Sequence, residues 1–256
     1  MSAYAERAAP GWVAGPVACL WSNVATGGTI LPDACVDLIH APGIGTFVAG
    51  PDTRPVTGGG DPATGAITGL RLRPGHAGAA LGVPAHEMRD RRVWLDDIWG
   101  RSGRELTARL DDAPTTAARQ ALLAAAVARR RGQADPIALG AVALLAQDPG
   151  LRIAAVAAEL AVSERHLLRR LRAAVGYGPK TLARILRFQR LLALAQAGTV
   201  NLADLALSAG YADQPHMTGE VTRLAGAPPT AVLGIAHARG DAELVRSVQD
   251  GSRAAA

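Results

Sequence analysis

The feature that most constrains the fold of this 256-residue chain is an internal duplication in its C-terminal half. Two segments follow the same order of helix, short turn, helix and a terminal Gly-x-x-Pro. Self-similarity at a fixed period indicates a structural unit used twice. The matching positions, each 50 residues apart, are Leu171, Gly176 and Pro179 in the first copy and Val221, Gly226 and Pro229 in the second.

The first copy has the signals of two short helices joined by a tight turn. Its leading helix is predicted at 153–160, and a three-residue turn follows at 161–163. Ser163 is a favourable N-cap for a second helix at 164–175, and Gly176 suits the C-terminal end of that helix. Two short helices joined by a turn of this length form a helix-turn-helix.

The second copy repeats this arrangement. Asn201 is expected to cap a helix at 202–209, and Asp213 a helix at 214–225, with Pro215 tolerated in the first turn. Between the copies lies a predicted helix at 179–197, about 28 Å long at about 1.5 Å per residue. That length approaches the ~34 Å between successive major-groove faces on one side of B-DNA. The pattern predicts two DNA-reading helices, at 164–175 and 214–225, held apart by the rigid helix at 179–197.

The second helix of the first copy has one apolar side and one basic side. Arg165, Leu168, Arg169 and Arg172 share the side opposite the apolar stripe. Arginine can donate two hydrogen bonds to guanine O6 and N7, and leucine can contact a thymine methyl. We therefore predict that Arg165, Leu168 and Arg169 contact bases.

The corresponding helix of the second copy carries fewer groups suited to DNA. Its outward positions are Gln214, Pro215, Thr218 and Gly219, and only Arg223 is basic. A glycine in mid-helix costs about 1 kcal/mol relative to alanine. We predict base contacts from Gln214 and Thr218, and expect the first copy to supply most of the specificity.

The distribution of charge agrees with a polyanion partner. Residues 1–149 hold 14 arginines and 14 acidic residues, whereas residues 150–239 hold 11 basic and 5 acidic residues. A localised basic excess is typical of surfaces that bind nucleic acid, although a solvated arginine-rich helix surface has the same composition. We predict phosphate contacts from Arg172, Lys180, Arg184 and Arg187, and a steep loss of affinity with added salt.

Composition excludes several other classes of protein. No apolar run reaches the roughly 18 residues of a membrane-spanning helix, and the N-terminus has no apolar signal segment. Two cysteines, Cys19 and Cys35, cannot form a disulfide framework. No phosphate loop, nucleotide fingerprint or metal-ligand spacing is present. We expect a cytoplasmic protein with no membrane segment, no cofactor and no metal, which is not an enzyme.

The N-terminal half differs in periodicity from the duplicated region. Short apolar runs alternate with Gly and Pro turns between residues 10 and 80, which predicts a small β-sandwich or barrel. Residues 84–111 become helical, and an alanine-rich helix is predicted at 115–131. The chain therefore divides into a β-rich ligand-sensing or dimerisation domain at 1–112, a helical connector at 113–134, a double helix-turn-helix domain at 135–238 and a tail at 239–256. The fold class is α+β.

The duplicated region resembles the AraC/XylS-type transcriptional regulators. The resemblance covers about residues 137–236 and rests on VAAELAVSERHLLRRL at 156–171, GYADQPHMT at 210–218 and the paired Gly-x-x-Pro ends. It implies a seven-helix domain that binds double-stranded operator DNA. It also implies base contacts from Arg165, Leu168 and Arg169 and from positions 214, 215, 218 and 219, where Gly219 replaces the usual arginine.

The N-terminal half is similar to an uncharacterised domain found on some of these regulators. The matching stretches are ILPDACVDLI at 30–39, AGPDTRPV at 49–56, and LGVPAHEM with LDDIWG between residues 81 and 100. By family analogy this domain is a cupin-like barrel that senses a small-molecule effector or forms a homodimer.

Two other functions are compatible with parts of the sequence. Cys35 lies near Asp33, Asp37 and His40, so a DNA-tethered enzyme or a thiol or alkyl sensor acting through Cys35 is one alternative. In an extended strand, however, Asp37 and His40 point to opposite faces. The second alternative is a partner-binding module whose basic helices contact protein, and a gel-shift assay separates it from a DNA-binding regulator.

Overall fold

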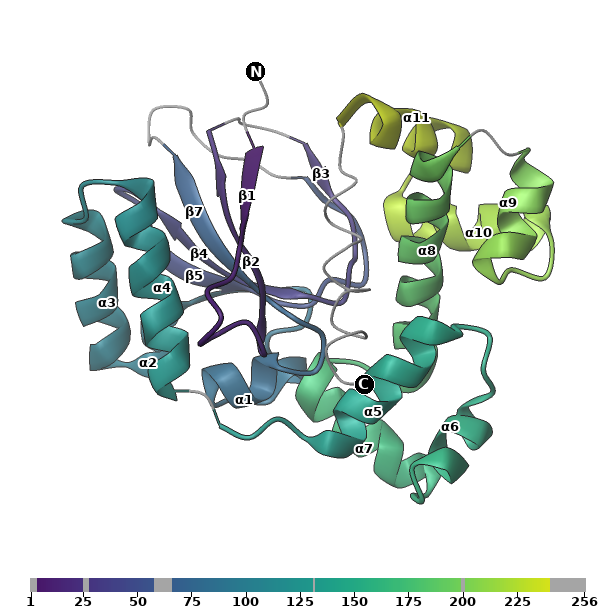
Figure 1. The fold of residues 1–256 in the computed structure, drawn as a ribbon, viewed down its shortest axis with the longest axis horizontal. Coiled ribbons are helices and arrows are strands. Elements are labelled where there is room, and N and C mark those ends of the chain that lie inside the picture. The colour runs from purple at the N-terminus through teal and green to yellow at the C-terminus, as the bar shows by residue number, and fades with distance from the viewer. Residues whose placement is uncertain (1–3, 25–27, 58–65, 131, 199–200, 240–256) are drawn as a thin grey trace.

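The computed structural model describes residues 4–24, 28–57, 66–130, 132–198 and 201–239. Its N-terminal part contains a six-stranded antiparallel sheet, in the order β1-β2-β7-β4-β5-β8, and a two-stranded ribbon of β3 and β6 (Figure 1). No strand pairing among the described residues joins the edge strands β1 and β8, so the main sheet is open. The strands are β1 (Tyr4–Ala8), β2 (Val17–Asn23), β3 (Thr29–Ile30), β4 (Val36–Ala41), β5 (Gly45–Ala49), β6 (Val56–Thr57), β7 (Ile67–Leu72) and β8 (Arg92–Trp94).

One face of this sheet is apolar and is covered by helices. Leu20 of β2 and Leu38 of β4 are both register partners of Leu70 of β7, and all three are fully buried, which places them together on the covered face. Figure 1 shows α3 and α4 on the outer side of the sheet. The elements of this layer are α1 (Ala77–Leu81), the short 3-10 helix η2 (Ala85–Glu87), α2 (Leu95–Trp99), α3 (Arg101–Asp111) and α4 (Thr116–Arg130).

The helix predicted as a connector is part of this N-terminal core. Leu123, Ala124 and Val127 of α4 are fully buried in the same apolar cluster as the sheet residues. The alanine-rich sequence lets α4 lie close to the sheet, because short side chains keep the helix axis near its neighbours.

Seven helices form the C-terminal part of the described chain, as the resemblance implied. They are α5 (Pro136–Gln147), α6 (Ile153–Glu159), α7 (Glu164–Val175), α8 (Pro179–Ala197), α9 (Leu202–Ala209), α10 (Gln214–Ala225) and α11 (Pro229–Arg239). The predicted α+β class, with a β-rich domain followed by a double helix-turn-helix joined by a long helix, is confirmed. The predicted tail at 239–256 lies outside the described residues beyond Arg239.

The predicted caps explain why these helices begin and end where they do. The side chains of Ser163, Asn201 and Asp213 each accept a hydrogen bond from a backbone N–H in the first turn of α7, α9 and α10. Gly176 and Gly226 follow the ends of α7 and α10 with φ of +100° and +70°, a conformation that glycine adopts without strain.

Several N-terminal elements were not predicted. β1 lies before the β-rich segment predicted at 10–80, α1 is a helix within that segment, and β8 interrupts the segment at 84–111 that was predicted to be helical. β8 has only three residues, which is too few for a periodic pattern to appear. It forms by pairing with β5, which lies more than 40 residues earlier in the sequence.

The two parts of the chain share an interface. Gln189 of α8 is buried and donates a hydrogen bond of 2.6 Å to the carbonyl oxygen of Pro32. Ala34, in the same loop, is buried within the apolar cluster of the C-terminal helices. α1 and η2 both contact α7, and Figure 1 shows α1 beside α7. None of the helices in the described part of the chain is long and apolar enough to span a membrane.

Candidate nucleic-acid interface

The first candidate reading surface is the outward side of α7. Leu167 and Leu171 on the inward side are fully buried and hold the helix against the domain core. Leu168, whose side chain is 42% exposed, lies on the outward side, a high value for a leucine. The predicted division of this helix into a buried and an exposed side is confirmed. The predicted DNA-facing residues, all exposed, are Arg165, Leu168, Arg169 and Arg172.

A shallow hollow of about 410 Å³ lies on this same surface. It is lined by the four outward residues of α7 and by His86 of η2. An element of the N-terminal domain therefore borders the basic side of α7, which the sequence pattern did not reveal.

The second candidate reading surface is the outward side of α10. Gln214, Pro215 and Gly219 are exposed, and Thr218 is half-buried. The Thr218 hydroxyl donates to the backbone carbonyl of Gln214 at 2.9 Å, so its proton is already engaged within the helix. This surface has fewer free donors than that of α7, in line with the expected weaker contribution of the second copy.

An ion-pair cluster joins α8 to α10. Glu220 Oε2 lies 3.1 Å from Arg187 Nη1, and Glu220 Oε1 lies 3.6 Å from Arg184 Nε. Arg187 also donates to the carbonyl oxygen of Pro149 at 2.9 Å, and its guanidinium lies over the ring of Tyr211. The side chain of Arg187 is only 13% exposed.

These contacts change the interpretation of two predicted phosphate-binding residues. The structure favours a positioning role for Arg187, because its guanidinium is engaged with protein groups on several sides. Arg184 shares the carboxylate of Glu220 and remains partly exposed. Lys180 is exposed near the start of α8, and its contact with phosphate stays a prediction, as does that of Arg172. Glu220 could have indicated the cluster, since an acidic residue on a DNA-facing helix requires a compensating partner.

The sheet face opposite the covering helices carries a buried polar cluster. Arg71, on β7, is 7% exposed and donates two hydrogen bonds of 3.1 Å to Asp37. Its third nitrogen, Nη1, lies 3.7 Å from Asp33 and 3.8 Å from Glu6. Burial raises the pKa of Asp33, and the nearby Arg71 partly offsets that rise.

Cys35 lies beside this cluster, in surroundings that disfavour the thiolate form of its side chain. Cys35 is buried, and burial together with the Asp33 carboxylate holds the pKa of its thiol well above the ordinary value. A thiolate is the reactive form of cysteine, so this environment disfavours nucleophilic or sensing chemistry. His40 lies on the other sheet face, 3.5 Å from Asp111 of α3, as the strand alternation predicted. Among the described residues, no group of three metal-ligating side chains is gathered.

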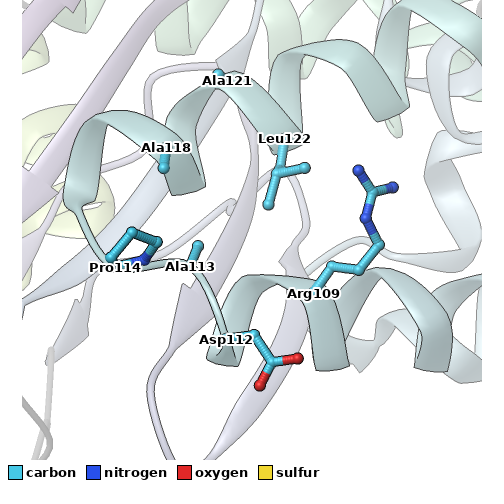
Figure 2. A pocket seen from close by; sticks show the side chains of 7 residues that line it. All are labelled: Arg109, Asp112, Ala113, Pro114, Ala118, Ala121 and Leu122. Atoms are coloured by element: carbon cyan, nitrogen blue, oxygen red, sulfur yellow. The ribbon is translucent and has the colours of Figure 1, made fainter.

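A second hollow, of about 500 Å³, lies between α3 and α4 (Figure 2). Figure 2 shows the small side chains of Ala118 and Ala121 on α4, with Arg109 of α3 and Asp112, which follows α3, at the opposite side. This surface belongs to the helical layer of the N-terminal domain.

Two family models match separate parts of the chain. Residues 156–234 match a helix-turn-helix domain, and residues 12–94 match a domain of unknown function (DUF6597). The first match spans both predicted helix-turn-helix units, and the second spans most of the β-rich part. No curated protein matches the sequence significantly.

Solved structures of ToxT from Vibrio cholerae have similar folds at low identity. One crystal structure of ToxT from strain O395 is 11% identical over 84% of this chain and 97% of its own, with a TM-score of 0.46. Another, bound to (E)-4-(8-methylnaphthalen-1-yl)but-3-enoic acid, is 10% identical over 92% of this chain and all of its own, with a TM-score of 0.47. Similarity at this level does not extend the ligands of those proteins to this chain.

Proposed function

Because the chain carries an AraC-type helix-turn-helix domain behind a DUF6597 domain, we propose that it is a sequence-specific transcriptional regulator that reads two adjacent major grooves. The observation that carries this proposal is the pair of capped second helices, α7 and α10, each with an exposed outward side and both packed against the single helix α8. In a helix-turn-helix, the second helix is the one that enters the major groove.

The residues divide into base-contacting and phosphate-contacting groups. On α7, Arg165 and Arg169 are positioned to donate to guanine edges, and the exposed Leu168 suits a thymine methyl. Arg172 and Lys180 are exposed cations, and we assign both to contacts with phosphates. Arg184 is partly exposed, and we assign it to a phosphate contact as well. On α10, Gln214 and Thr218 are assigned to bases, with Gln214 the freer donor.

Selection of duplexes from a random pool by the full chain tests this proposal. The expected result is one enriched sequence with two short conserved segments about one helical turn apart. A pool that stays random after repeated rounds would contradict sequence-specific binding and leave the basic helices without a DNA target.

The N-terminal domain is assigned the regulatory part of the function. Its helices α1 and η2 contact α7, and its Pro32 loop contacts α8, so a change in this domain reaches the reading helices without a separate connector. A small-molecule effector is the proposed signal, and a DNA-binding role implies a cytoplasmic location.

A second copy of the chain is the proposed partner at the hollow between α3 and α4. Small apolar side chains on the outer side of α4 permit close approach of another helix. Analytical ultracentrifugation of Ala121→Arg tests this: a dimer in the unmodified chain and a monomer in the variant are expected. A dimer that persists in the variant places the interface elsewhere.

A further inference from the structure

The two reading helices end at equivalent glycines that both meet one loop of the N-terminal domain. Gly176 follows α7 and Gly226 follows α10, at matching positions of the duplication. A Cβ on Gly176 would lie 2.5 Å from Pro51 Cγ, and a Cβ on Gly226 would lie 3.2 Å from Pro55 Cγ. Real Cβ atoms do not approach other atoms to 2.5 Å, so the proline ring at Gly176 occupies space that only glycine leaves open.

The loop that carries these two prolines, residues 50–55, is held firmly to its own domain. Asp52 accepts two hydrogen bonds from Arg92, of 2.9 Å and 2.8 Å. Thr53 donates its backbone N–H and its hydroxyl to Asp90, at 2.7 Å and 2.9 Å. Each proline also restricts its own backbone, because its ring fixes φ. The loop therefore presents Pro51 and Pro55 at a set separation.

From these contacts we infer that Pro51 and Pro55 form a two-point brace that sets the spacing between the reading helices and hence the half-site spacing of the DNA. The inference rests on the proposed function. Without the brace, the position of α10 relative to α7 depends on α8 and on the ion pairs of Glu220. One added base pair moves a half-site by about 3.4 Å and turns it by about 35°. If Pro51 and Pro55 fix α10 relative to α7, α10 cannot shift to follow the displaced half-site.

The test measures how much affinity is lost when the spacing between the two half-sites is changed. This loss is separate from the affinity for the selected duplex itself. The probes are the duplex selected from a random pool by the unmodified chain and two derivatives, with one base pair added or removed between the half-sites. The variant is Pro51→Ala/Pro55→Ala, which removes both rings. The matched control is Pro42→Ala, because Pro42 is a half-buried proline of the same domain, in the turn between β4 and β5.

The ratio of the Kd for the altered duplexes to the Kd for the selected duplex is the readout. The ratio is expected to fall at least about threefold in the double variant and to stay unchanged in Pro42→Ala. When α10 can shift, the binding free energy that is lost on the misaligned duplex becomes smaller. An unchanged ratio in a double variant that unfolds as cooperatively as the unmodified chain would overturn the brace.

Two further results complete the test. If the double variant does not fold, Pro55→Ala alone is used, since Pro55 is half-buried and loosens only the α10 side. An unchanged ratio in that folded single variant also overturns the inference. Failure of the unmodified chain to select any duplex contradicts the proposed function itself, and the brace then has no spacing to determine.

Discussion

At the scale of single residues, the arginines of α7 carry the proposed specificity. Arg169 is exposed on the helix, one turn after Arg165, where a guanidinium can reach a base edge. Periodicity alone was sufficient to place these side chains outward, because an amphipathic helix buries its apolar stripe. It was not sufficient for Arg187, whose partners Glu220 and the Pro149 carbonyl lie in other elements.

We expect Arg169→Ala to relax sequence preference at one base pair of the selected duplex. The loss of one bidentate contact should cost about 1–3 kcal/mol of discrimination there and leave the other positions unchanged. The measurement is a competition assay with variants of the selected duplex, in which each position is replaced in turn by each of the four base pairs. Discrimination that is unaltered at every position would mean that Arg169 does not read bases.

A second prediction at this scale concerns the buried His40. Burial lowers the pKa of His40 below its ordinary value of 6.5, although Asp111 partly opposes the shift. The folded state therefore stays neutral where the unfolded state binds a proton, so the free energy of unfolding should fall as pH decreases below about 6.5. His76 acts in the same direction.

Urea unfolding between pH 7.5 and pH 5 measures this dependence, with His40→Gln as the comparison. The variant should lose a smaller part of its stability on acidification than the unmodified chain does. An identical slope in the two proteins would show that protonation of His40 is not linked to folding.

At the scale of elements, the sequence predicted the duplicated unit better than the β-rich domain. The bounds of α7, α8, α9 and α10 agree with the prediction because each has its own local signals: a capping side chain, a proline in the first turn or a C-terminal glycine. The strands lack such signals, and β8 and the burial of α4 depend on pairing and packing across distant parts of the chain.

The glycine in mid-α10 leads to a prediction about this element alone. A Cβ on Gly219 would meet no atom within 4 Å, so Gly219→Ala should stabilise the protein by up to about 1 kcal/mol. The matched control is Gly103→Ala in α3, where the new Cβ would lie 2.6 Å from the backbone oxygen of Leu95 and should destabilise the fold. Urea unfolding of both variants measures the difference, and a loss of stability in Gly219→Ala would mean that the outer side of α10 is not open.

At the scale of the whole molecule, the N-terminal domain lies against the C-terminal helices at several points. Pro32 and Pro51 from two separate loops, and Ala85 from η2, approach α8 or the end of α7. The sequence divided the chain into independent parts because charge and periodicity change between them, and neither property reports on contact between domains. The molecule is therefore better described as a double helix-turn-helix unit held by the N-terminal domain.

The central claim is that α7 and α10 occupy two successive major grooves on one face of the duplex. Methylation interference on the selected duplex tests it most directly, because methylation at guanine N7 blocks contacts in the major groove. The account predicts two clusters of interfering guanines about one helical turn apart, with the cluster under α7 weakened in Arg169→Ala. A single cluster, or two clusters on opposite faces of the duplex, would contradict it.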